Sequence, residues 1–200
     1  LENIISKARG RVFITGFSSN FWRIQSVLKV CKNLNKKLIV DGRGLKDSVD
    51  IAQTLGRLSP DLPTLIDERQ AVKTPNNKLV VLLSGSQGET RSSLVRTALG
   101  THRFLKIKKG DLVIFSARSI PGNEKKITKL IDFLKELGAD IITAKDAPDI
   151  HVSGHAHRQE LAKMIELVKP KYYTPIHGNY SILIDNESIL SETAWKPQSV

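Results

Sequence analysis

The chain has very little cysteine and no long apolar run, and both absences narrow what it can be. Its 200 residues include one cysteine, Cys31, so no internal disulfide can form, which is typical of a protein in a reducing compartment. The longest apolar run is the five residues 79–83, far short of the roughly 18 that span a bilayer. The first residues show no charged-then-apolar signal pattern. We therefore expect a cytoplasmic protein that does not cross a membrane.

Three common catalytic patterns are also missing. The sequence has no Gly-x-Ser-x-Gly elbow of a serine hydrolase and no glycine-rich loop that ends in the lysine of a nucleoside triphosphatase. The segment 41–44, Asp-Gly-Arg-Gly, lacks the spacing of a dinucleotide fingerprint. A Rossmann-like nucleotide binder is thus a weak alternative. Calorimetry that showed tight binding of a dinucleotide would support it.

Charge gives the first positive indication of function. The chain carries 31 Lys and Arg against 20 Asp and Glu, for a net charge of +11. A field of that sign favours polyanions, so nucleic acid is the expected partner class. The hydrophobic share of 40% and the charged share of 26% are those of a globular protein with a core, which excludes disorder.

Apolar runs rich in β-branched residues alternate with helical patterns along the chain. The predicted strands are 11–17, 37–40, 79–83, 112–115, 140–143 and 172–176, and the predicted helices are 20–34, 45–55, 124–137 and 159–168. Most strands are continuously apolar, as in strands covered on both faces. The alternation predicts a Rossmann-like α/β fold, a parallel sheet with helices on both faces and ligand-binding loops at the carboxyl ends of the strands. We expect Cys31, Trp22 and Met164 to pack in the core.

Two of the predicted loops have the composition of anion-binding loops. Ser18, Ser19 and Asn20 precede a helix, where they can cap its free N–H groups or leave them for a phosphate. The segment 84–89, Ser-Gly-Ser-Gln-Gly-Glu, can form a backbone nest for an anion. Glu89 would repel phosphate there unless it positions a polar group or a metal.

Histidines gather in the last third of the chain. Four of the five lie there, at His151, His155, His157 and His177. Imidazole is a common metal ligand and a good proton donor near neutral pH, so His155 and His177 are candidates for catalysis. A tetrahedral zinc site needs three or four protein ligands, and the pattern His-x-His-x-Asp-His is absent. The chain by itself therefore cannot complete a zinc centre.

Taken together, these loops resemble the ribonuclease J family over roughly residues 1–180. The segments that carry the resemblance are 20–25, 84–89, 100–103, 120–124, 151–155 and 170–178. The family forms the beta-CASP branch of the metallo-beta-lactamase superfamily and processes RNA. Its beta-CASP domain is inserted into a lactamase domain that holds two zinc ions. Because the chain begins at Leu1 within a helical pattern, we expect it to be a piece of such a protein.

The resemblance implies a division of the chain and a set of site residues. Residues 1–150 would form the beta-CASP domain, 151–180 the segment returning to the metallo-beta-lactamase domain, and 181–200 a tail of uncertain structure. His155 would protonate the leaving oxygen and His177 would ligate one zinc. The residues implied to bind substrate are Ser18, Ser19, Asn20, Ser84, Gly85, Ser86, Gln87, Ser153 and Gly154.

The function implied is that of a zinc-dependent ribonuclease, cutting internally or from the 5′ end in RNA processing and decay. The implied partners are RNA, the metallo-beta-lactamase domain of the same parent chain and further copies in a homo-oligomer. The 200 residues alone are expected to be inactive because they supply at most one zinc ligand. The alternative is a non-catalytic RNA-binding or assembly module with the same fold.

Overall fold

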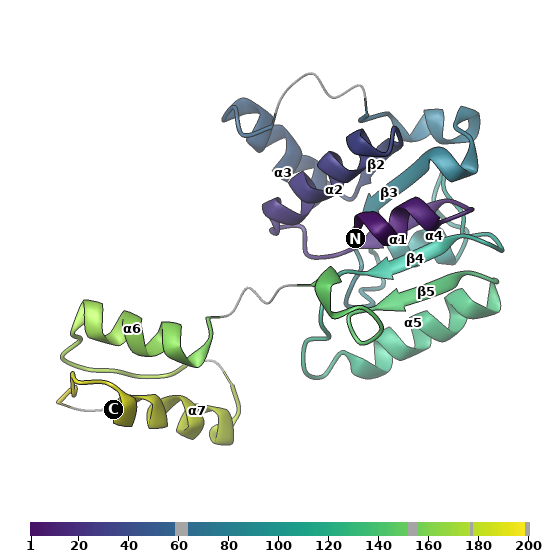
Figure 1. Cartoon of the computed structure of the whole chain (residues 1–200). Coiled ribbons are helices and arrows are strands. Elements are labelled where there is room, and N and C mark those ends of the chain that lie inside the picture. Colours follow the sequence, from purple (N-terminus) through teal and green to yellow (C-terminus); the bar gives the residue numbers. More distant parts are fainter. Residues whose placement is uncertain (59–63, 152–155, 177, 199–200) are drawn as a thin grey trace. The chain divides into compact units, whose positions relative to one another are not determined.

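The computed structural model describes residues 1–58, 64–151, 156–176 and 178–198. The chain divides into two compact units, Leu1–Val152 and Ser153–Val200 (Figure 1). Each unit is described by itself.

The first unit alternates strands and helices. Its elements are α1 (Glu2–Lys7), β1 (Val12–Thr15), α2 (Phe21–Asn33), β2 (Lys37–Asp41), α3 (Arg43–Thr54), β3 (Leu79–Leu83), α4 (Ser93–Ala98), β4 (Leu112–Phe115), α5 (Glu124–Glu136) and β5 (Asp140–Thr143). Short 3₁₀ turns lie at Glu68–Lys73, Asn76–Lys78 and Pro148–Ile150.

All five strands run parallel, in the order β2-β3-β1-β4-β5. Their carboxyl ends therefore share one edge of the sheet. The chain leaves β1 toward β2 on one side and leaves β4 toward β5 on the other, so the two connections diverge. Such a divergence is the topological switch point at which open α/β sheets bind ligands. The carboxyl ends of β1 and β4 are thus the first place to look for a site.

Alternation along the strands builds a core on each face of the sheet. Even-numbered strand residues such as Val12, Ile14 and Val80 pack against α1, α2 and α3. Odd-numbered residues such as Phe13 and Val81 pack against α4 and α5. Because both faces are covered, nearly every position of the central strands is apolar and buried. The predicted Rossmann-like α/β fold is confirmed (Figure 1).

The sixth predicted strand does not form. Tyr172 makes a single bridge, and residues 173–176 have no regular structure. A strand needs neighbours for its backbone N–H and C=O groups, and no strand of more than one residue lies in the described part of the second unit. Apolar composition alone therefore made 172–176 look like a strand.

The second unit is a small helical assembly. It contains α6 (Arg158–Val168), α7 (Tyr180–Glu187) and a 3₁₀ segment, Ser188–Glu192. Ile165, Ile189 and Leu190 are its buried centre. Arg158 ties α6 to the 3₁₀ segment through Nε donating to Glu192 Oε1 at 2.6 Å. The tail, left without a predicted structure beyond residue 180, is largely helical in this unit.

Two of the three expected core residues are exposed. Cys31 is fully buried, as predicted, whereas Trp22 is 72% and Met164 59% exposed. Trp22 shares the outer side of α2 with Ser26 and Lys29, which are also exposed. Helical position therefore outweighs residue type here. No helix within the described residues is long and apolar enough to cross a membrane.

Candidate nucleic-acid interface

The loop after β1 leads into the N-terminus of α2 and contacts α3. Asn20 caps α2, with Oδ1 accepting from Arg23 N–H at 3.1 Å. Ser48 Oγ on α3 donates to Ser18 O at 3.0 Å. Ser18 and Ser19 thus lie beside a capped helix N-terminus, whose partial positive charge favours an anion. The capping role of Asn20 is confirmed, and a binding role for the three residues stays a prediction.

The Ser84–Gln87 loop is folded back on α4. Gly85 has a φ of +122°, and a Cβ there would lie 2.5 Å from Ser92 Oγ. Leu94 N–H donates to Ser84 O at 3.0 Å, which closes the turn between β3 and α4. Only glycine suits both the backbone angle and the contact at position 85. The loop is therefore a fixed feature of the carboxyl edge.

Gln87 joins this loop to the one after β4. Its Nε2 donates to Arg118 O at 3.0 Å, and its Oε1 accepts from Ile120 N–H at 2.8 Å. Gln87 is 4% exposed, and both bonds are partly buried. Glu89 Oε2 accepts from Gln87 N–H at 3.1 Å. Glu89 thus holds the Gln87 backbone, and the Gln87 carboxamide joins the two loops.

At the end of β2, Asp41 lies in a buried polar cluster that sequence reasoning did not assign. Asp41 Oδ2 accepts from His102 Nε2 at 3.0 Å, and the nearest nitrogens of Lys46 and Arg96 are 3.8 and 3.9 Å from its carboxylate. Burial alone would raise the pKa of Asp41, but the hydrogen bond from Ser93 and the neighbouring His102 outweigh it and lower the pKa. The carboxylate stays ionised at neutral pH.

His151 lies after β4 and the 3₁₀ turn, where the charges of Arg23 and Arg118 act on its ring. Ser116 Oγ donates to Ile150 O at 2.5 Å, which fixes His151 beside the end of β4. Burial lowers the pKa of His151, outweighing the hydrogen bond to the Ser116 backbone, and the charges of Arg118 and Arg23 lower it further. His151 is therefore a neutral imidazole near pH 7.

Four of the predicted site residues cannot be placed. Ser153, Gly154, His155 and His177 lie outside the described residues. The described residues include no group of three or more His, Cys, Asp or Glu side chains placed to hold a metal ion.

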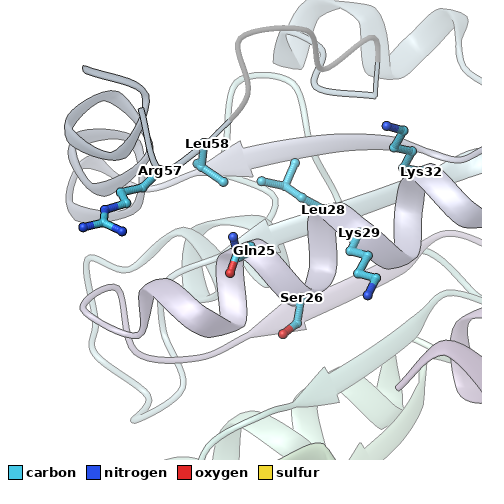
Figure 2. A pocket seen from close by; sticks show the side chains of 7 residues that line it. All are labelled: Gln25, Ser26, Leu28, Lys29, Lys32, Arg57 and Leu58. Atoms are coloured by element: carbon cyan, nitrogen blue, oxygen red, sulfur yellow. The ribbon is translucent and has the colours of Figure 1, made fainter. Parts of the chain in front are cut away.

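Two cavities of the first unit differ in how their polar groups are arranged. One of about 520 Å³ lies between α2 and the residues after α3. Figure 2 shows the charged ends of Lys29, Lys32 and Arg57 pointing away from one another there. A second, of about 500 Å³, lies at the carboxyl ends of β4 and β5, with Arg118 and Lys145 beside an apolar floor. Ligand sites combine an apolar lining with a few polar groups, so the second of these two positions is the better one.

The chain matches two family descriptions in succession. Residues 9–134 match "Ribonuclease J, beta-CASP domain", and residues 146–196 match "Zn-dependent metallo-hydrolase RNA specificity domain".

Similar proteins share these regions. The chain is 38% identical over 180 residues to Ribonuclease J of Helicobacter pylori, covering 90% of this chain and 26% of the relative. It is 32% identical over 200 residues to Ribonuclease J of Mycoplasma genitalium, covering 100% and 35%. It is 41% identical over 178 residues to Ribonuclease J of Sinorhizobium meliloti, covering 89% and 31%. The chain thus spans about a quarter to a third of these relatives.

Proposed function

The chain belongs to the ribonuclease J beta-CASP family, and from this we propose that it is the RNA-binding portion of a zinc-dependent ribonuclease of RNA processing and decay. The observation that carries the proposal is the pair of family matches, which cover most of the chain in the order beta-CASP domain and then RNA specificity domain. The activity belongs to the longer parent protein. Within that protein, residues 1–150 form the beta-CASP domain, and 151–180 return toward the catalytic domain.

The carboxyl edge of the sheet supports RNA binding. The loop at Ser18–Asn20, the rigid loop at Ser84–Gln87 and Arg118 all lie at the ends of parallel strands. The net charge of +11 attracts a phosphate backbone and raises its rate of encounter. Because Gln87 holds two of these loops together, they present one rigid surface. We propose this edge as an RNA-contacting surface. A substrate-binding role for Ser153 and Gly154, which lie outside the described residues, is proposed from the family resemblance alone.

The catalytic roles are proposed from the family resemblance. His177 supplies one zinc ligand through its imidazole, and His155 gives a proton to the leaving oxygen. When bound, zinc supplies polarisation of the scissile phosphate and neutralises its developing charge. This chain contributes at most one ligand, so we propose that the 200 residues alone bind RNA without cutting it. The metallo-beta-lactamase domain of the parent completes the site, and the parent acts as a homo-oligomer in the cytoplasm.

The test compares the 200-residue chain with the same chain joined to its catalytic half. A 5′-monophosphorylated RNA is incubated with each, with and without zinc. We expect the chain alone to bind without cleavage and the joined protein to cleave. His155→Ala in the joined protein should lower the rate by about 10²- to 10⁴-fold, as loss of a general acid does. His177→Ala should lower both the rate and the zinc content.

Two outcomes would contradict the proposal. Cleavage by the 200 residues alone would show a complete active site within them. Tight RNA binding by a joined protein that never cleaves would favour the alternative, a non-catalytic RNA-binding or assembly module of the same fold.

A further inference from the structure

The outer side of α2 carries positive charge that no nearby acidic residue in the sequence balances. Residues 3–40, which include α2, contain eight Lys and Arg and no Asp or Glu, and so supply +8 of the net charge of +11. Lys29 and Lys32 of α2 are exposed, and neither forms an ion pair with a carboxylate among the described residues. Like charges three residues apart on a helix repel each other. A bound polyanion would relieve that repulsion.

The two lysines line an open cavity of about 520 Å³ together with Arg57, which follows α3. No Asp or Glu of the described chain lines this cavity, whereas Asp47 and Asp50 of α3 line a different one. The acidic residues of α3 therefore lie away from the basic side of α2. A surface of one sign attracts a ligand of the other sign, here a polyanion.

The charged ends in this cavity do not converge on one point. Figure 2 shows the side chains of Lys29, Lys32 and Arg57 pointing away from one another. A single small anion is held by donors that converge on it, whereas a nucleic acid can place a different phosphate beside each cation. The arrangement therefore fits an extended chain of phosphates better than it fits one phosphate group.

An exposed tryptophan lies on the same side of α2, nearer its N-terminus. Trp22 precedes Lys29 by seven residues, about two helical turns, so the two share a side of the helix and lie about 10 Å apart along its axis. The Trp22 side chain is 72% exposed, and the Phe21 ring lies beside it with centroids 5.8 Å apart. Bases of single-stranded nucleic acids stack on aromatic side chains that line a basic groove.

These residues form a continuous surface that starts at the carboxyl edge of the sheet, because α2 follows β1 directly. We propose that the outer side of α2 is a track for single-stranded RNA, in which a base stacks on Trp22 and successive phosphates pass Lys29, Lys32 and Arg57. We call these four residues the α2 track. The inference rests on the proposed RNA-binding function and adds to it a second contact surface, leading away from the carboxyl edge.

The first experiment measures binding of the 200-residue chain to a dye-labelled single-stranded RNA by fluorescence anisotropy over a range of salt concentrations. The double variant Lys29→Gln, Lys32→Gln should bind more weakly. Its slope of log affinity against log salt should be smaller by about 1.4, because each phosphate contact contributes about 0.7. Adding Arg57→Gln should lower the slope by about a further 0.7. The thermal midpoint of the double variant should not fall, since the change removes a repulsion within α2.

The matched control is Lys129→Gln with Lys135→Gln on α5, a helix of 13 residues like α2 that packs on the other face of the sheet. Both lysines are exposed, and each lies three residues from Asp132, so their charge is balanced locally. The control makes the same change in net charge. It should leave the salt slope nearly unchanged.

A second experiment tests stacking on Trp22. Trp22→Ala should lower the affinity for RNA about 5- to 100-fold, the effect of losing one stacked base. Trp22→Phe should keep most of the affinity, because phenylalanine retains an aromatic face. The chain has two tryptophans, so in a Trp195→Phe background Trp22 is the sole indole emitter. RNA should quench its fluorescence.

Equal salt slopes for the α2 double variant and the α5 control would overturn the inference while leaving RNA binding, and the proposed function, intact. So would Trp22 fluorescence that does not change at saturating RNA. Weaker association of the double variant with the separated catalytic half, at unchanged affinity for RNA, would assign the α2 track to a protein contact and also overturn it. If the chain binds no RNA, the proposed function fails, and this inference fails with it.

Discussion

His102 and Asp41 form a buried hydrogen-bonded pair. Backbone N–H groups that bond to the His102 ring determine which ring nitrogen is the donor to Asp41. His102 Nδ1 accepts from the N–H groups of Phe104 and Leu105, at 3.2 and 3.1 Å, so the proton of the ring is on Nε2. That Nε2–H donates to Asp41 Oδ2 at 3.0 Å. The pair thereby fastens the loop after α4 to the carboxyl end of β2.

Asp41→Asn should change how stability depends on pH. The pKa of Asp41 is lowered in the folded protein, so its stabilisation is present above the unfolded carboxyl value of about 3.9 and is lost as pH falls through the folded value. At pH 7 we expect Asp41→Asn to lose about 1–3 kcal/mol of unfolding free energy. Urea unfolding at pH 7 and at about pH 3 should show a smaller difference at the acid end. Asp140→Asn, at an exposed carboxyl, is the control; equal effects of the two substitutions would refute the role of the pair.

Gln87→Ala should loosen the loop after β4. It removes two partly buried hydrogen bonds and leaves Ile120 N–H and Arg118 O without their protein partner, at a cost of about 1–3 kcal/mol. Hydrogen exchange at Ile120 should become faster than in the wild type. Gln25→Ala, on the outer side of α2, is the matched control and should leave that exchange rate unchanged (Figure 2).

Gly10→Ala should be strongly destabilising. A Cβ at position 10 would lie 2.0 Å from the backbone oxygen of Gly110, so main chain must move. We expect a loss of about 1–3 kcal/mol or more, seen as a lower thermal midpoint. At Gly16 the nearest atom would be 3.4 Å away, an ordinary contact, so Gly16→Ala is the control. Similar midpoints for the two variants would show that the approach of residues 10 and 110 is not tight.

Cys31 should be unreactive in the folded protein. Burial raises the pKa of its thiol to about 12, and the side chain is fully covered by the core. A thiol reagent at pH 8 should therefore label Cys31 only after denaturant is added. Rapid labelling under native conditions would mean that the core around α2 opens readily.

The sheet was predictable because its strands have a distinctive composition. A strand covered on both faces is apolar at every position, and the runs at β3 and β4 show this without reference to the rest of the chain. The same criterion failed at residues 172–176, because an apolar segment becomes a strand only beside other strands. The sequence patterns also missed the helix α4, because six residues are too few to show a clear helical period.

The site was predictable only where its interactions are local. The cap on α2 depends on Asn20 and Arg23, three residues apart, and was expected from the residue type. The bonds from Gln87 to the loop after β4 and from His102 to Asp41 join residues 31 to 61 positions apart. No pattern in a single sequence reveals such pairs. The segment 100–103 was singled out by family resemblance, which gave no partner for His102.

The central place of β1 has a consequence for synthesis on the ribosome. It precedes the other strands of this sheet in the sequence, yet its two neighbours are β3 and β4, and β3 begins 67 residues after Val12. At about 5–20 residues per second, the apolar strand Val12–Thr15 waits roughly 3–13 s before either neighbour emerges. During that interval β1 stays exposed on the nascent chain without a strand to pair with, so a chaperone is expected to bind this segment before β3 is made.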